Sequence, residues 1–175
     1  MPLVLPSTER EVVRLFAVGD RVVYPNHGAG IIESVDERVV EGEARRYFVL
    51  KLSQGDLKVL VPTDNTRQVG MRGVISASEV DQVFDVLKQE QSAMPTNWNH
   101  RYKKNRDKVK SGDVYEVAEV VRNLAIRDRE KGLSTGEKRM LNLARDILVS
   151  EIVFAKDCAG DEVRQMMEEI FCVGV

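Results

Sequence analysis

The hydrophobic pattern of the chain changes near residue 74, and this change limits the folds that the chain can adopt. Before it, apolar residues alternate with polar ones, as at Phe48, Leu50 and Leu52, and this period of two is typical of a strand with one buried face. After it, apolar residues recur three and four positions apart, as on the buried side of a helix. The sequence therefore predicts an α+β protein in which a small β unit precedes a helical unit.

Residues 16–72 contain short β-prone segments separated by glycine-containing turns. The expected strands are Arg21–Tyr24, Ile31–Val35, Arg38–Val40, Tyr47–Leu52 and Leu57–Val61, with a hairpin turn at Glu41-Gly42-Glu43. Short strands joined by tight turns predict a strongly bent sheet or an SH3-like small β-barrel. Lys and Arg balance Asp and Glu over residues 1–72, with ten of each sign, so this half does not look like a nucleic-acid surface.

Residues 1–15 stand apart as an N-terminal extension, for which a short helix capped by Thr8 and a frayed end are both open interpretations. The apolar start lacks a basic segment and a cleavage site, so we expect no signal peptide. No stretch approaches the roughly 20 apolar residues of a membrane helix. We therefore expect a soluble, cytoplasmic protein with no membrane partner.

Residues 73–175 predict a compact bundle of about five helices. The signals that begin or end these helices are Ser76-x-x-Glu79, Asn97, Lys131-Gly132, Ser134-x-x-Glu137 and the segment Asp161–Phe171. We divide this half into a first helix with its linker, residues 73–97, and the remainder of the helical domain, residues 98–175.

Trp98 is the only tryptophan, and it opens the most basic segment of the chain. From Trp98 to Lys110 there are six basic residues against one acidic residue, whereas the whole chain has a net charge of −2. A concentrated basic patch beside an aromatic ring indicates a nucleic acid that is bound by its backbone. A second basic pair, Lys138-Arg139, follows the Ser134 cap, and helix starts bind phosphate well. We expect these two helix starts to lie side by side.

The residues alone leave other interpretations of this segment open. A lone Trp at a helix start also occurs packed inside its own bundle, and a basic run also occurs as a solvated helix face. We expect Arg101, Lys104 and Lys108 to share one face of the helix. No helix-turn-helix with a polar recognition face is present in the sequence, so readout of base edges is not expected.

The sequence favours a binding module over an enzyme. His27 and His100 are the only side chains with an ordinary pKa near neutrality, and neither lies near a nucleophile motif. The glycines after His27 join two strands and match neither a phosphate-binding loop nor a dinucleotide fingerprint. Cys158 and Cys172 lack the spacing of a metal site and are expected to be two unpaired thiols. We therefore expect no cofactor, no metal and no small-molecule substrate.

Several segments together resemble the CarD/CdnL family of bacterial transcription regulators. They are Phe16–Gly30, Tyr47–Lys51, Pro95–Trp98 with Arg101-Tyr102, Ala118–Arg122, and Gly132–Ser134 through Met140-Leu141. The resemblance runs over residues 16–172 in the family's order and spacing. It is specific because the joint match, and no single motif, carries it.

The resemblance implies that residues 16–72 form a Tudor-like domain that docks on the β1 lobe of the RNA polymerase β subunit by pairing sheet edges. Arg38 matches a contact arginine of the family, and Leu60 and Pro62 fall on the strand that meets the lobe. Position 60 is basic in some members, so a charge contact is absent here. The polymerase would also bring the protein to the nucleoid.

The resemblance further implies that the helical domain lies against promoter DNA at the upstream edge of the transcription bubble. Trp98 would then wedge into the minor groove and stabilise the open complex, largely without sequence preference. The family's basic-patch positions fall on Arg101, Lys103 and Lys138, with Arg139 adjacent and His100 where an arginine is common. Since His100 is mostly neutral at pH 7, we expect its phosphate contact to be weak.

Two other functions stay open on the residues alone. One is a free-standing nucleic-acid-binding protein, because the Gly19-Asp20 start and the following glycine turn resemble small barrels of ribosomal and elongation proteins. Strong, salt-dependent binding by the isolated protein would support it, and the net charge of −2 argues against it. The other is a protein scaffold in which Trp98 is buried in the bundle.

Overall fold

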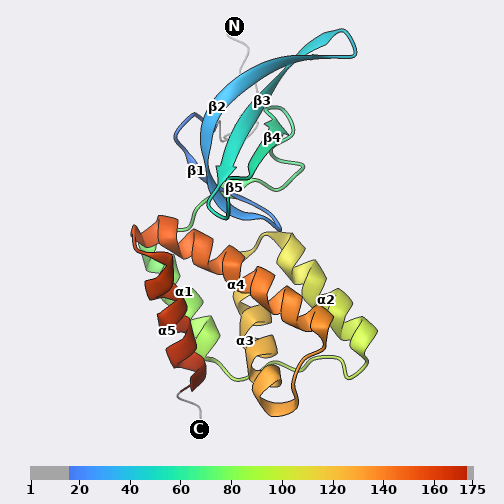
Figure 1. Ribbon diagram of the computed structural model, residues 1–175, viewed down its shortest axis with the longest axis vertical. Helices are drawn as coiled ribbons and strands as arrows, with labels where there is room; N and C mark the ends of the chain where they lie inside the picture. The colour runs from blue at the N-terminus through green and yellow to red at the C-terminus, as the bar shows by residue number, and fades with distance from the viewer. Residues whose placement is uncertain (1–15, 173–175) are drawn as a thin grey trace, which may run out of the picture.

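A computed structural model describes residues 16–172, and it places a five-stranded antiparallel sheet above a bundle of five helices (Figure 1). The strands are β1 (Arg21–Tyr24), β2 (Gly28–Val40), β3 (Glu43–Leu52), β4 (Lys58–Pro62) and β5 (Arg72–Gly73). The helices are α1 (Ala77–Lys88), α2 (Trp98–Ser111), α3 (Val114–Lys131), α4 (Thr135–Lys156) and α5 (Gly160–Cys172). The predicted fold class, a small Tudor-like β domain followed by about five helices, is confirmed. The extension expected at residues 1–15 lies outside the described residues.

The strands follow the order β4-β3-β2-β1-β5, so β4 and β5 form the two edges of the sheet. β2 and β3 form a long hairpin that projects away from the helices (Figure 1). Its two-residue loop, Glu41-Gly42, has φ values of 53° and 82°. Positive φ at both positions is required by the type I′ turn that matches the twist of paired strands, as the predicted hairpin needs.

One expectation about β2 is wrong. The sequence predicted two strands separated at Asp36-Glu37, whereas β2 is continuous and bends at a bulge between Ile32 and Ser34. Asp36 and Glu37 lie opposite Tyr47 and Arg46 on β3. Asp36 is partly buried and Glu37 is exposed, because this part of the hairpin extends beyond the apolar core of the sheet, so both polar residues keep their backbone pairing.

Two hydrophobic cores hold the two halves. The core of the sheet consists of Val22, Ile32, Phe48, Leu50, Val61 and Met71. The larger core of the bundle comes from the apolar stripes of α1, α3, α4 and α5, with α3 and α4 packed against each other at its centre. Helix α2 contributes one buried side chain, Val109, to this core, and its half-buried Tyr102 packs against it. Its other buried side chains are Arg101 and Asn105, so α2 is held largely by polar contacts.

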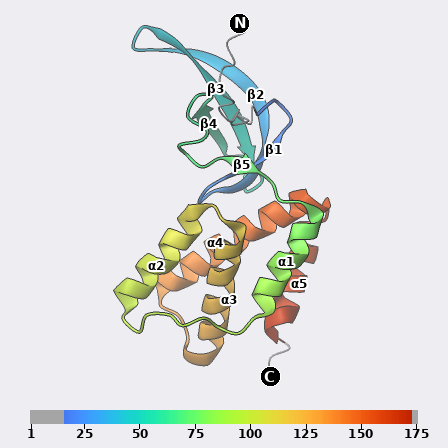
Figure 2. The ribbon, with the colours of Figure 1, turned by 180° about the vertical axis from the view of Figure 1, so that it is seen from behind.

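The sheet and the bundle meet at α4, which lies directly beneath the strands in both views (Figures 1 and 2). The guanidinium of Arg72 on β5 binds both carboxylate oxygens of Glu151 on α4, at 2.6 and 2.9 Å. The same carboxylate accepts the backbone N–H of Ile75, at 3.1 Å, and Arg72 also donates to the carbonyl of Gly112. Glu151 is 1% exposed and the Arg72 side chain is 30% exposed, so a partly buried ion pair joins the two halves.

Close backbone contact reinforces the junction. The N–H of Ala29 donates to Oγ of Ser150 at 2.9 Å. A Cβ atom on neighbouring Gly28 would lie 2.7 Å from that oxygen, and Gly28 also has a φ of 91°. Glycine is therefore needed at position 28 for two reasons, the positive φ and the close approach of α4.

The Glu151 carboxylate predicts a measurable difference between two ion pairs on α4. Glu151→Ala leaves the Ile75 N–H without its acceptor and the Arg72 guanidinium with only the carbonyls of Gly73 and Gly112, so we expect the free energy of unfolding to fall by about 2–3 kcal/mol. Asp146→Ala is the control, because Asp146 pairs with Arg164 at the surface and such pairs contribute about 1 kcal/mol or less. Urea denaturation of both variants measures the difference. Equal losses would contradict a structural role for the Arg72–Glu151 pair.

Candidate nucleic-acid interface

The starts of α2 and α4 lie side by side, on the side of the bundle away from the sheet (Figures 1 and 2). The indole N–H of Trp98, the first residue of α2, donates to Oγ of Ser134, the N-cap of α4, at 2.9 Å. One turn further along, Nε of Arg101 donates to Oε1 of Glu137 at 2.7 Å. The expectation that these two helix starts are neighbours is confirmed.

Local sequence signals explain why both helices begin here. The side chain of Asn97 accepts the backbone N–H of His100 at 3.2 Å and so caps α2. At α4, Oγ of Ser134 accepts the N–H of Glu137 at 3.2 Å, and Oε2 of Glu137 accepts the N–H of Ser134 at 3.2 Å. This reciprocal pair is the capping box that the sequence predicted.

Trp98 is not packed inside the bundle: 43% of its surface is exposed. Its ring stacks on Tyr102 with a centroid distance of 5.0 Å and an interplanar angle of 18°. The scaffold interpretation, in which this ring is buried, therefore does not describe the structure. An exposed indole whose N–H is already bonded offers an apolar surface to a partner.

Arg101 has a different role from the one expected. It is 3% exposed, and besides Glu137 it donates to the backbone carbonyls of Pro95 and Thr96, at 3.1 and 3.0 Å. The expectation that Arg101 contacts DNA is therefore revised, because its guanidinium is committed inside the protein. Arg101 joins the segment before α2 to the first turn of α4.

Arg101, Lys104 and Lys108 lie on one side of α2, as their spacing predicts, but they do not form one exposed cationic face. Buried residues of α2 recur every four positions, at Arg101, Asn105 and Val109. This stripe faces the bundle, so Lys104 is exposed, whereas Lys108 is partly buried and pairs with Glu119 on α3 at 2.7 Å.

Exposed basic side chains surround the two helix starts. We call them the basic surface; its members are His100, Lys103, Lys104, Arg106, Lys138 and Arg139. Within residues 16–172 none of these six has an ion-pair partner. A cluster of solvated cations beside an exposed aromatic ring is chemically suited to a phosphate backbone. The predicted residues Trp98, His100, Lys103, Lys138 and Arg139 thus all lie on α2 and α4.

The predicted polymerase contacts lie on the sheet. Arg38 is exposed on β2 near the end of the hairpin, directly opposite Arg45 of β3. Leu60 is 37% exposed on β4, and Pro62 ends that strand. Since β4 pairs only with β3 among the described strands, its outer edge presents unpaired backbone groups.

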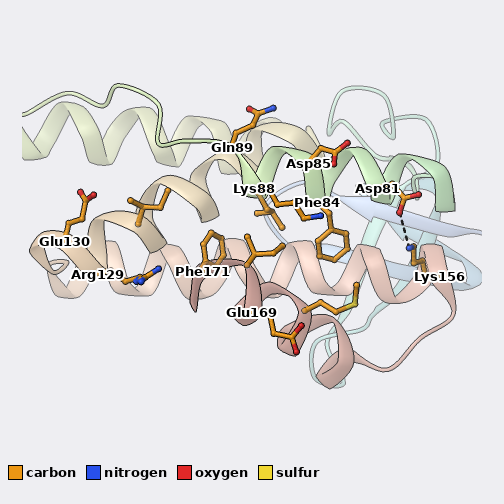
Figure 3. A pocket seen from close by; sticks show the side chains of 14 residues that line it. Asp81, Phe84, Asp85, Lys88, Gln89, Arg129, Glu130, Lys156, Glu169 and Phe171 are labelled. Carbon is orange, nitrogen blue, oxygen red and sulfur yellow. Dashed lines mark hydrogen bonds and ion pairs between the residues drawn. The ribbon is translucent and has the colours of Figure 1, made fainter. Parts of the chain in front are cut away.

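The described residues hold no other site with evident chemistry. A groove of about 1120 Å³ lies among α1, α3 and α5, with an apolar lining that includes Phe84, Met166 and Phe171 and with the Asp81–Lys156 ion pair at its rim (Figure 3). It contains no histidine or cysteine. Within residues 16–172 no group of three His, Cys, Asp or Glu side chains is placed to hold a metal, and Cys158 and Cys172 are free thiols. Among the same residues, no helix combines the length and the apolar character needed to cross a membrane.

The sequence does not predict two features of this site. It identifies Ser134 and Glu137 only as a capping box, whereas they also bind Trp98 and Arg101, which lie 36 positions earlier. Tyr102 was noted, but its stacking on Trp98 was not predicted. The one available signal was the spacing, since residues four apart on a helix are neighbours.

Comparisons with known proteins match both halves of the chain. A family model described as CarD-like/TRCF RID domain matches residues 16–75, and one described as CarD, C-terminal domain matches residues 82–168. A protein of Bacillus subtilis (strain 168) named "Putative transcription factor YdeB" is 35% identical over 150 residues. That alignment covers 86% of this chain and 98% of the relative.

The Arg101–Glu137 pair predicts a pH dependence of stability. Burial raises the pKa of Glu137, but the hydrogen bonds from Arg101 and Ser134 outweigh it and hold that pKa below its ordinary value of 4.5. Stability from this carboxylate is therefore full above the ordinary pKa and is lost as pH falls through the lowered pKa of the folded state. We expect the difference in unfolding free energy between the natural protein and Glu137→Gln to be constant near neutral pH and to shrink in acid. Denaturant titrations across that range test this, and a difference that is independent of pH would contradict it.

Proposed function

The chain belongs to the CarD family, and from this premise we propose that it regulates transcription by docking on RNA polymerase and stabilising the promoter open complex. The observation that supports this most is the exposed ring of Trp98 at the junction of two helix starts, beside exposed cations that have no ion-pair partner within residues 16–172. The name of the Bacillus subtilis relative, a transcription factor, agrees with the proposal.

The basic surface supports contact with DNA through phosphates. Its side chains come from two helices. When such cations neutralise DNA phosphates, the counterions bound to the DNA are released, and this release favours binding. Trp98 supplies an apolar wedge, and a wedge that partly unstacks a base step responds to the deformability of DNA. This combination suits the edge of a melted region, where unstacking costs least, and it needs no particular base sequence.

The sheet supports docking on the β1 lobe of the polymerase β subunit. The free edge of β4, which carries Leu60, can extend a partner's sheet by backbone hydrogen bonds. Arg38 and Arg45 lie directly opposite each other, and like charges in that position are unfavourable; Glu43, 3.8 Å from Arg45, offsets part of this repulsion. An acidic partner surface would relieve the remainder, which supports a docking contact at the hairpin.

The junction at α4 supports joint action of the two surfaces. A flexible linker would only raise the local concentration of the helical domain at the promoter. The partly buried Arg72–Glu151 pair and the Ser150–Ala29 hydrogen bond hold sheet and bundle together. Docking of the sheet on polymerase therefore also sets the position of Trp98.

The Trp98 ring predicts a kinetic effect without loss of docking. We expect Trp98→Ala to shorten the lifetime of the promoter open complex roughly tenfold, since contacts between an aromatic ring and a base are worth about 1–3 kcal/mol. Binding to polymerase should be unchanged. Competitor-challenge decay of open complexes measures the lifetime, and Met166→Ala, which removes another exposed apolar side chain, is the control. An unaltered lifetime for Trp98→Ala would overturn the wedge.

The hairpin predicts a defect of the opposite kind. We expect Arg38→Glu to weaken binding to polymerase by about tenfold or more, because unfavourable charge contacts at interfaces cost several kcal/mol. Arg129→Glu makes the same change on an exposed position of α3 and should bind normally. Titration with labelled polymerase measures both. Normal affinity of Arg38→Glu would move the interface elsewhere, and tight salt-dependent DNA binding without polymerase would favour the free-standing alternative.

A further inference from the structure

The indole N–H of Trp98 and the cap of α4 share one oxygen atom, Oγ of Ser134. We infer that Ser134 is a positioning residue for Trp98, which seats one edge of the indole on the first turn of α4 and holds the rest of the ring outward. This inference rests on the proposed function of Trp98, and it adds a residue that would act on DNA only through that ring.

The hydrogen bonds of Ser134 leave its hydroxyl no freedom to turn. Oγ accepts from Nε1 of Trp98 at 2.9 Å and from the N–H of Glu137 at 3.2 Å, and it donates to Oε2 of Glu137 at 3.0 Å. A hydroxyl has one donor and two acceptor sites, so all three are used. The lone pair that faces the indole is therefore fixed in direction.

A buried ion pair anchors this arrangement. Oε1 of Glu137, the oxygen that does not bind Ser134, accepts Nε of Arg101 at 2.7 Å. Both side chains are nearly inaccessible, at 4% and 3% exposure. Arg101 and Glu137 thus hold the Ser134 hydroxyl in place, and Arg101 acts at this site through the cap, not through DNA.

Neighbouring residues also contact the Trp98 ring. Tyr102 stacks against one face of the indole. A Cβ atom on Gly136 would lie 3.6 Å from Cζ2 of Trp98 and 3.4 Å from Cε2 of Tyr102, so both rings border this turn of α4. Nε1 and Cζ2 belong to the same edge of the indole, and that edge faces α4. Tyr102 and α4 thus cover one face and one edge of the ring, and the residue as a whole is 43% exposed.

Holding the ring in this way has a functional consequence. A side chain that is free in solution loses rotamer entropy when it is ordered at an interface, and a side chain that is already ordered loses less. An indole held by Ser134 is thus ordered before it meets DNA. Losing the Trp98–Ser134 hydrogen bond should weaken insertion of the ring even though the indole itself is still present.

The chain contains a matched control. Ser76 caps α1 in the same way: Oγ accepts the N–H of Glu79 at 3.3 Å and donates to Oε2 of Glu79 at 3.0 Å. No indole lies at that cap, since Trp98 is the only tryptophan. Ser76→Ala and Ser134→Ala therefore remove equivalent capping boxes, and only Ser134→Ala also removes the acceptor of the Trp98 N–H.

The experiment compares Ser134→Ala, Ser76→Ala and Ser134→Thr in the full chain. The single indole N–H resonance in a ¹H–¹⁵N spectrum reports the Trp98–Ser134 hydrogen bond in the absence of polymerase. Open-complex decay reports function in the presence of polymerase. We expect Ser134→Ala to shift this resonance, to speed its exchange with solvent and to shorten the lifetime several-fold. Ser76→Ala should change neither, although both alanine variants lower the unfolding midpoint. Ser134→Thr, which keeps a hydroxyl, should restore both signals.

Three results would overturn the inference. An unmoved indole resonance in Ser134→Ala would show that the hydrogen bond does not hold the ring. An equal loss of lifetime in Ser76→Ala would show a general effect of destabilised caps. If the open-complex lifetime is normal with Ser134→Ala but shortened with Trp98→Ala, Trp98 acts as a wedge and Ser134 has no role in positioning it. If open complexes formed with Trp98→Ala decay at the normal rate, the proposed function fails. The role of Ser134 then fails with it, whatever the indole resonance shows.

Discussion

The Arg72–Glu151 ion pair is the interaction on which the arrangement of this protein depends. Each half has a hydrophobic core of its own, so neither core determines how the halves sit together. The carboxylate of Glu151 binds the last strand of the sheet and the backbone of Ile75, just before α1 begins. Because the buried carboxylate of Glu151 would be costly to leave unpaired, one geometry of the junction is strongly favoured. The two proposed contact surfaces are thereby held in a defined relation.

A second set of polar contacts fixes α2 against α4 at the far end of the bundle. Helix α2 buries one apolar side chain among its three buried residues, so apolar packing alone holds it weakly. The Arg101–Glu137 pair and the Trp98–Ser134 hydrogen bond attach its start to α4. This leaves the outer face of α2 free to carry charge. A helix with a wide apolar stripe could not present so many cations beside an exposed ring.

Both anchors end on α4, and this explains how a contact at the sheet can matter at the basic surface. Glu151 lies in the last third of the helix and Ser134 caps its start, so one helix runs from the junction with the sheet to the start of α2 (Figure 1). The hydroxyl of Ser150 and the carboxylate of Glu151 meet the sheet, while Glu137 meets α2. The helix is thus the physical connection between a docking surface and a ring that acts on DNA, if the proposed function holds.

The sequence by itself determined the features that depend on neighbours in the chain. Period-two and helical periodicity, the two capping boxes and the Glu41-Gly42 turn each involve residues only a few positions apart, so their patterns identify the helices, the strands and the hairpin turn. Only the tertiary structure decided that Arg101 is buried, that β2 is continuous and that Ser134 binds Trp98. These outcomes depend on partners far apart in sequence, 36 positions for Arg101 and Glu137 and 79 for Arg72 and Glu151. A charged residue on a helix looks the same in sequence whether it meets solvent or a buried carboxylate, because packing selects its partner.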